Sequence, residues 1–332
     1  MKLTFLWQGS SQRERDWIAE IFSPIAGEQI IDGKHSVVLD DCLLLDSYLH
    51  SHPRDYYEQF RGKNAWLFHL SDETFEGGYD RYECFRGVFR NYWSDIFNPR
   101  RVLQIPLGYS EGIRSGANSL RNSDRPYLWC FLGAGGKSTR PEMLKAFEPL
   151  KPHFTHITDR GSVKRIDKQQ YVSILRDSVF VPSSMGNVNL DCFRVYEALE
   201  CGTIPLLEKR PRFDYFRQLF GPHPLPTFSS WDRAARFVAS VRDDSLALDR
   251  LLTECSQWWS AYKKNLSTCV ERFIAEPPQL ESGSFVTWRR SLPGWQAYEL
   301  LRHHNLAAFA RRIGTQAARL RNEGRLRKTA GV

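Results

Sequence analysis

An arginine and a glutamate lie close together near the start of the stretch from Asp191 to Leu207, which is otherwise largely apolar. Arg194 and Glu197 are three residues apart, so they share one face of a predicted helix that ends at Gly202. A guanidinium offers a fork of N–H donors to phosphate, and a carboxylate accepts hydrogen bonds from sugar hydroxyl groups. The pair predicts an anion and sugar site, although the same spacing also occurs in plain surface ion pairs.

The polar loop before this helix carries further candidate ligand-binding residues. They are Ser183, Ser184, Gly186 and Asn187. We expect Asn189 or Asp191 to cap the helix, and we expect free N–H groups in the loop and at the helix start. Such donors, at the positive end of the helix dipole, favour phosphate. After the helix, Thr203–Leu207 reads as a buried parallel strand.

A glycine-rich turn, Gly133 to Arg140, follows an apolar segment and precedes a predicted helix. It is not a P-loop, because position 131, where that motif needs its first glycine, holds Phe. Backbone N–H groups together with Lys137 and Arg140 still suit a diphosphate. A phosphate-handling kinase therefore stays open as an alternative function.

The pattern Asp-x-Phe-Arg-x-x-Glu-Ala-Leu-x-x-Gly-x-Ile-Pro runs from Asp191 to Pro205. It resembles the nucleotide-sugar half of exostosin-like glycosyltransferases, which have the GT-B fold. The preceding segment Tyr171–Pro182 is similar to the helix and strand that lead into this motif. Phe131–Gly133, with Arg140, is similar to the family's first strand and phosphate-side loop. The similarity covers residues 126 to 230.

The resemblance implies specific roles and a specific fold. Arg194 would hold the diphosphate of the donor, and Glu197 its nucleoside. The expected fold class is α/β, with two doubly wound Rossmann-like domains that face a cleft and a helical C-terminal extension. The expected donor is a UDP-sugar, for instance of glucuronic acid, galactose or xylose. The expected acceptor is a saccharide or a lipid-linked glycan, in surface polysaccharide synthesis such as capsule assembly.

The mechanism can be narrowed further by two features of the motif region. Retaining GT-B enzymes often have a glutamate eight residues before the position of Glu197, and here that residue is Asn189, which favours inversion. No Asp-x-Asp occurs, so no metal or other cofactor is implied, and Arg, Lys and the helix dipole would stabilise the leaving group. A nonhydrolysing sugar-nucleotide epimerase and a catalytically inactive nucleotide-sugar-binding scaffold remain alternatives.

Inversion requires a base, and two carboxylates follow the predicted strand Ala65–Leu70. Ligands of doubly wound sheets bind at the carboxyl ends of the strands, where Asp72 and Glu73 lie. Either could take the proton of an acceptor hydroxyl, and we favour Asp72, which could equally cap the next turn. We expect His69 to be a core residue.

Length and segment pattern predict two domains and an extension. We expect an acceptor-side domain at 1–120, a nucleotide-sugar-binding domain at 121–275, and a basic helical extension at 276–332 that packs back on the first domain. The predicted strands are 2–7, 36–40, 65–70, 102–107, 127–132, 154–158, 179–182 and 203–207. The predicted helices are 12–22, 53–60, 79–93, 141–150, 168–177, 231–241 and 243–274.

The net charge of +8 is concentrated at the end of the chain. Residues 301–332 hold eight Lys or Arg and one acid, a net +7, and an apolar stripe recurs at helical spacing within 306–320. This helix could pack on the domains or contact anionic lipid, whereas a nucleic-acid partner is not indicated. We interpret the seven scattered cysteines as buried thiols. From the first residues of the chain we expect a cytoplasmic protein, with peripheral contact to the inner membrane face as an alternative.

Overall fold

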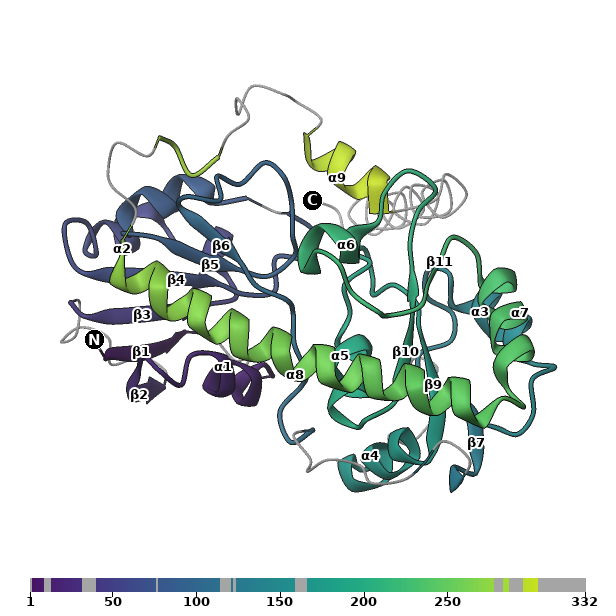
Figure 1. Ribbon diagram of the computed structural model, residues 1–332. Helices are drawn as coiled ribbons and strands as arrows, with labels where there is room; N and C mark the ends of the chain where they lie inside the picture. Colours follow the sequence, from purple (N-terminus) through teal and green to yellow (C-terminus); the bar gives the residue numbers. More distant parts are fainter. Residues whose placement is uncertain are drawn as a thin grey trace, which may run out of the picture.

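The protein consists of two α/β domains that lie side by side (Figure 1). The computed structural model describes residues 2–8, 13–31, 40–75, 77–113, 121, 124–158, 166–277, 283–286 and 295–303. The first domain contains a six-stranded sheet of order β2-β1-β3-β4-β5-β6, and the second a five-stranded sheet of order β11-β10-β9-β7-β8. All neighbouring strands are parallel, so both sheets are of the predicted class.

In the first domain the strands are β1 Leu3–Gln8, β2 Ala26–Ile31, β3 Cys42–Asp46, β4 Ala65–His69, β5 Val88–Arg90 and β6 Val102–Gln104. Its helical elements are α1 Arg15–Ile21, η2 Leu49–Ser51, α2 Arg54–Glu58 and η3 Tyr79–Cys84. β3 and β4 are buried along their whole length, as near-continuous apolar runs of parallel sheets are.

In the second domain the strands are β7 Tyr127–Gly133, β8 His153–Ile157, β9 Ser178–Ser183, β10 Ile204–Glu208 and β11 Thr227–Phe228. The helices are α3 Arg140–Phe147, α4 Lys168–Arg176, α5 Phe193–Glu200, α6 Tyr215–Phe220, α7 Trp231–Val241 and α8 Ser245–Ala275. Every predicted strand and helix of this half is confirmed to within a few residues. The motif helix α5 buries most of its side chains before the buried strand β10.

The first domain departs from the sequence-based prediction at several of its elements. The predicted helix over 79–93 is wrong, because a short 3-10 helix is followed here by strand β5. Aromatic and β-branched residues at 85–89 favour a strand. Gly87 permits the close approach to β4, since an added Cβ would lie 2.6 Å from the Trp66 ring. The predicted strand 36–40 lies almost wholly outside the described residues. Strands β2 and β3 were not predicted.

Helix α8 joins the two domains. It starts beside α7 in the second domain and runs across to the first (Figure 1), over roughly 45 Å at 1.5 Å per residue. Trp259 stacks on Trp17 of α1, with ring centroids 5.6 Å apart and planes 11° apart. Nearer its end, Phe273 packs edge-on against Trp66 and Phe89. These aromatic contacts fix the domains to one another.

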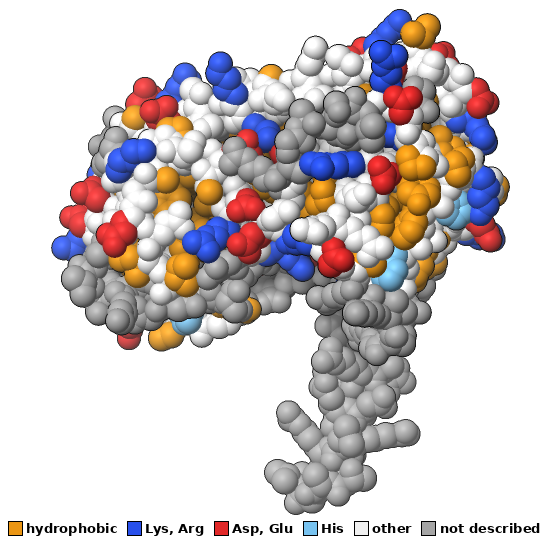
Figure 2. All heavy atoms as spheres, turned by 90° about the horizontal axis from the view of Figure 1, so that it is seen from below, with side chains coloured by type: hydrophobic (Ala, Val, Ile, Leu, Met, Phe, Trp, Pro, Cys, Tyr) orange, Lys and Arg blue, Asp and Glu red, His pale blue; other side chains and the backbone are white. Residues whose placement is uncertain are grey.

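A last helix, α9 Trp295–His303, lies between the two domains in Figure 1. The predicted basic helix at 306–320 lies outside the described residues. No helix in the described part of the chain is long and apolar enough to cross a membrane. Acidic and basic side chains are interspersed on the face shown in Figure 2. Six cysteines are buried as expected, but Cys269 is exposed.

Candidate functional site

Two adjoining cavities, of about 510 and 470 Å³, form a cleft between the domains. The first cavity is lined mainly by the second domain, including Gly133, His156 and Tyr171. The second cavity is lined by both domains. Arg13, Ser110 and Glu197 line both cavities, so the two form one continuous site. Most lining residues follow the carboxyl ends of strands, where doubly wound sheets bind ligands.

Arg140 and Arg194 bring two positive charges together in the second cavity. Each is less than a tenth exposed, and their guanidinium carbons lie 5.9 and 4.6 Å from the centroid of the Phe131 ring. Arg194 Nη2 donates to the carbonyl of Leu132 at 3.2 Å, and Arg140 Nη1 to that of Ala134 at 2.8 Å. Both Nε atoms are buried without an acceptor.

No carboxylate among the described residues forms an ion pair with either guanidinium. Burial, and then the neighbouring charge of Arg194, lowers the pKa of Arg140 to about 10. Two buried cations without a counter-ion are unfavourable, and an anionic ligand between them would remove that cost. The pair is therefore suited to an anionic ligand.

The N-terminus of α5 adds donors beside these arginines. Its N-cap is Cys192, which makes no side-chain capping bond, so the prediction that Asn189 or Asp191 caps this helix is wrong. Asp191 instead accepts hydrogen bonds from Tyr196 and Tyr215, at 2.6 and 3.1 Å. Its burial raises its pKa to about 6.

Because the cap is missing, the first N–H groups of α5 stay available. The N–H groups of Phe193 and Arg194 donate to no acceptor among the described residues. They lie at the positive end of the helix dipole, and both residues line the second cavity. An oxyanion beside them would gain backbone donors as well as the two guanidinium groups.

Glu197 lies where the two cavities meet. Its Oε1 accepts a 2.5 Å hydrogen bond from Ser110 Oγ, and its Oε2 a 2.6 Å bond from the Tyr171 hydroxyl. Burial, and then the charge of Glu197, raises the pKa of Tyr171 well above its usual value. The carboxylate is thus held in place, with lone pairs remaining for ligand hydroxyl groups.

Glu73 anchors the loop between β9 and α5. Its Oε1 accepts from the N–H groups of Val188 and Asn189, at 2.8 and 3.2 Å, and its Oε2 from the Asn187 amide at 3.1 Å. The expectation of free N–H groups in this loop is therefore wrong for Val188 and Asn189. Lys137 Nζ donates to Asn187 Oδ1 at 2.8 Å, which draws the glycine-rich turn to the same loop.

Asp72 has a different environment from its neighbour. Its side chain is 3% exposed, lies 3.3 Å from the guanidinium of Arg90, and accepts a 2.8 Å bond from the Tyr79 hydroxyl. Arg90 is fully buried. Asp72 therefore balances a charge inside the first domain and does not line either cavity. His69 is a buried core residue bonded to Tyr82, as predicted.

The predicted site residues divide into two groups. The second cavity brings together Glu73, Lys137, Arg140, Gly186, Asn187, Arg194 and Glu197, and Gly133 lines the first. Gly133 has a φ of 139°, and an added Cβ would lie 3.2 Å from Arg194 Nη2. Ser183 and Ser184 are fully buried and, like Asp72, are not among the lining residues.

Sequence reasoning missed the first-domain wall of the second cavity. This wall consists of Arg13, Glu14, Ser71, Glu73, Tyr92, Leu107 and Ser110, of which only Glu73 was predicted. Glu14 precedes α1 but makes no side-chain capping bond, and Ser71 Oγ donates to its Oε1 at 3.4 Å. The sequence signal was weak, because Glu14 lies within the predicted helix 12–22 and six residues after the end of β1.

Three carboxylates lie near Tyr92 on this side of the second cavity, where Arg13 also lies. Burial raises the pKa of Tyr92 well above the usual value, and the carboxylates of Glu73, Asp191 and Glu14 raise it further. All four residues line the second cavity. Tyr92 also has a φ of 60°, a strained conformation for a residue with a large side chain. The cleft thus has a cationic side and an anionic side.

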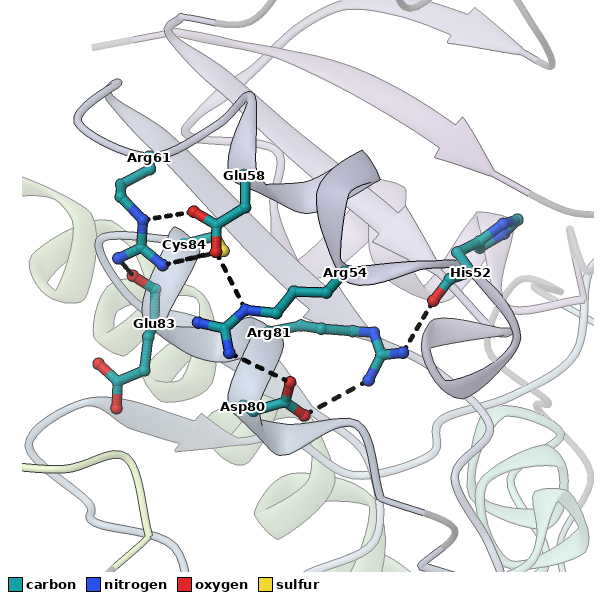
Figure 3. Close-up of polar contacts among 8 residues, drawn as sticks. All are labelled: His52, Arg54, Glu58, Arg61, Asp80, Arg81, Glu83 and Cys84. Carbon is teal, nitrogen blue, oxygen red and sulfur yellow. Dashed lines mark hydrogen bonds and ion pairs between the residues drawn. The ribbon is translucent and has the colours of Figure 1, made fainter.

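Charged residues also cluster in the first domain around α2 and η3, as Figure 3 shows, but here each guanidinium has a partner. Glu58 pairs with Arg54 and Arg61, at 3.0 and 2.6 Å. Asp80 pairs with Arg54 and Arg81, at 3.9 and 3.4 Å. We call these five residues the paired network. Each arginine in it has a carboxylate partner, so none of them requires a ligand.

Comparison with known sequences gives a partial match over the second domain. The family model of the RXYLT1 C-terminal domain matches residues 113–215. Ribitol-5-phosphate xylosyltransferase 1 of Danio rerio is 28% identical over 131 residues, which span 36% of this chain and 30% of that relative. Residues 113–215, which the family model matches, include Arg140, Arg194 and Glu197.

Solved structures match over both domains. An alpha-glucosyltransferase in complex with UDP-glucose and DNA has a TM-score of 0.51, 11% identity, and coverage of 82% of this chain and 98% of that one. The chain has the GT-B fold. An alpha1,3-fucosyltransferase with GDP has a TM-score of 0.50 and 11% identity, with 87% and 93% covered. Anabaena HepE with UDP and glucose has a TM-score of 0.50 and 9% identity, with 83% and 100% covered.

Proposed function

We propose that the protein is an inverting glycosyltransferase that uses a nucleotide-sugar donor. The observation that carries this proposal is the buried pair of Arg140 and Arg194, which has no carboxylate partner among the described residues and lies beside the uncapped N-terminus of α5. A diphosphate fits this charge, since it carries negative charge on adjacent groups and becomes more negative as the sugar leaves. The sequence match to a xylosyltransferase supports a sugar as the transferred group.

The two cavities suggest how the donor binds. The nucleoside occupies the first cavity, with its ribose hydroxyl groups on Glu197, which lies at the junction. The diphosphate binds between Arg140, Arg194 and the start of α5. The sugar then extends into the second cavity toward the first-domain wall. The acceptor, a saccharide or lipid-linked glycan as in surface polysaccharide synthesis, enters from that wall.

Glu14 is the general base in this proposal. It lines the second cavity, where Ser71 Oγ donates to its Oε1, whereas Asp72 does not line the cavity and Glu73 holds the loop between β9 and α5. Glu14 takes the proton from the acceptor hydroxyl as its oxygen bonds to the anomeric carbon. The bond from that carbon to the diphosphate oxygen breaks, and the diphosphate leaves with the electron pair. Attack opposite the leaving group inverts the configuration.

The transferred sugar is uncharged in this proposal. The carboxylates of Glu14, Glu73 and Asp191 surround the space beyond the arginines, and all three act on Tyr92. They would repel the carboxylate of a glucuronic acid donor, whereas the hydroxyl groups of a neutral sugar can donate hydrogen bonds to them. Xylose and galactose donors therefore fit better than glucuronic acid.

Calorimetric titration tests the donor site. We expect UDP to bind the wild type, because two of the three structural neighbours named above contain UDP or UDP-glucose. GDP, CMP and ATP serve as competitors. Arg194→Ala should abolish measurable binding. Arg61→Ala, which removes an exposed guanidinium of the paired network, is the matched control and should bind as the wild type does. Preference for ATP, or no nucleotide binding by the wild type, would overturn the proposal.

Measurement of turnover tests whether Glu14 is the general base. Glu14→Gln should lower the release of UDP from UDP-xylose or UDP-galactose about 100-fold to 10,000-fold and leave UDP affinity unchanged. Asp72→Asn should lower the Tm instead, because buried Arg90 loses its counter-ion. Full turnover in Glu14→Gln, with loss in a stably folded Asp72→Asn, would move the base to Asp72. Nucleotide binding without any transfer would favour the inactive scaffold.

A further inference from the structure

The loop 184–191 controls the geometry of the anion site, because it leads directly into the N-terminus of α5 and Arg194. Four of its backbone N–H groups donate to side chains from three separate parts of the chain. Met185 donates to Glu208 at 3.2 Å, Val188 and Asn189 donate to Glu73, and Leu190 donates to His303 Nδ1 at 3.2 Å. His303 is the only one of these acceptors outside the two sheet domains.

His303 is buried within an aromatic setting that spans both domains. It is fully buried at the end of α9. Its ring centroid lies 5.2 Å from those of Phe213 and Tyr215 in the second domain, and 6.4 Å from that of Phe75 in the first. Its carbonyl oxygen accepts a bond from Arg210 Nε. Packing therefore fixes the ring, and its Nδ1 faces the loop.

The rest of α9 is held at the same interface. Arg302 pairs with Asp95 of the first domain at 3.1 Å, and its guanidinium carbon lies 4.5 Å from the Phe213 ring centroid in the second. Glu299, fully buried, pairs with Arg302 at 3.0 Å. A helix attached to both domains is a firm support for the loop, because neither domain can shift without disturbing it.

We propose that His303 is a positioning residue that fixes loop 184–191, and through it the N-terminus of α5, for nucleotide binding. It is not among the residues that line either cavity, so it acts on the loop and not on the ligand. It does so through the Leu190 N–H and through the Asn189 side chain, whose Nδ2 lies 3.4 Å from its Nε2. Its action on the loop stands on the contacts above. Its effect on affinity rests on the proposed function.

Three variants separate hydrogen bonding from packing. His303→Phe keeps an aromatic ring between Phe213 and Tyr215 but has no acceptor for the Leu190 N–H. His303→Met also lacks that acceptor and adapts to the same space, so it replaces the Phe variant should that variant fold poorly. His303→Gln retains a side-chain oxygen that can accept the bond. All three leave the backbone contact with Arg210 unchanged.

Amide hydrogen exchange of the loop, measured without ligand, is the first readout. His303→Phe and His303→Met should speed exchange at Leu190 about fivefold or more, as expected for loss of one hydrogen bond, while exchange in β4 stays unchanged. His303→Gln should keep most of the protection. Wild-type protection of Leu190 in both folded acceptor-free variants would overturn the proposal.

UDP titration is the second readout. His303→Phe should weaken UDP binding severalfold, and His303→Gln should restore most of the affinity. Faster exchange with unchanged UDP affinity would overturn the link to nucleotide binding. A wild type that protects Leu190 through His303 but binds no UDP would refute the proposed function and leave the role of His303 in the loop supported.

Discussion

Arginines occur in two contrasting settings in this protein. In the paired network of the first domain, Arg54, Arg61 and Arg81 each form an ion pair with Glu58 or Asp80 (Figure 3). In the cleft, Arg140 and Arg194 are buried side by side and have no carboxylate partner within the described residues. The residue type is the same, but only the arginines of the paired network have carboxylate partners.

This difference separates structural charge from functional charge. A compensated exposed pair contributes little to stability and needs nothing further. An uncompensated buried pair reduces stability in the free protein, and groups perturbed in this way cluster at functional sites. The cleft pair is therefore evidence for a ligand, whereas the larger number of arginines in the paired network is not.

Loss of both cleft cations gives the largest expected effect. The double variant Arg140→Ala/Arg194→Ala should lower UDP affinity at least about 1,000-fold, since charge-assisted hydrogen bonds contribute roughly 1.5–3 kcal/mol each. The double variant Arg54→Ala/Arg81→Ala of the paired network is the control, and its affinity should match the wild type. Equal losses in both double variants would show that general charge, and not the cleft geometry, governs binding.

The sequence predicted most of the cationic side of the cleft. Arg140, Arg194 and Glu197 belong to one continuous stretch of strands and helices with strong periodicity, and all three line the cleft. Their roles depend mainly on contacts within one domain. Local pattern is therefore sufficient to place them, whatever the position of the other domain.

The anionic side was predicted less well, because it depends on backbone detail and on the second domain. Ser71 has a φ of 61°, which no pattern in the sequence shows, and after this turn Asp72 contacts Arg90 while Glu73 reaches the loop 184–191. Glu14 follows β1, but which strand ends face the cleft is decided by domain packing through α8. His303 could not be linked to that loop from sequence, since more than a hundred residues separate them.

Removal of the Arg140 charge should raise the thermal stability of the protein, although it lowers the affinity for UDP. The pKa of Arg140 is lowered to about 10 in the folded protein, mainly by burial, so its charged form disfavours folding at any pH below that value. Arg140→Met removes the charge and keeps much of the apolar contact with Phe131. We expect the Tm of the ligand-free protein at pH 7.5 to rise by several degrees. A lower Tm would mean that the carbonyl bonds of Arg140 outweigh its uncompensated charge.

Acid pH should stabilise the cleft through Asp191. Burial raises its pKa to about 6, above the ordinary value of 3.8, so the folded state binds this proton more tightly than the unfolded state. The resulting stabilisation is complete below pH 3.8 and is lost as the pH rises through 6. The slope of unfolding free energy between pH 5 and 7 should therefore become less negative in Asp191→Asn. If the slope is the same in the wild type and the variant, the titration of Asp191 does not cause it.

The paired network should give the smallest effect. Its arginines, Arg61 first, lower the pKa of Glu58 to about 2, and the corresponding stabilisation is present above pH 4.5 and lost as the pH falls toward 2. Because Glu58 is exposed, solvent screens these interactions, and Glu58→Gln should change the Tm at pH 7 by less than about 2 °C. A large drop in Tm would show that the network supports the first domain despite its exposure, and the contrast between compensated and uncompensated arginines would then concern ligand binding alone.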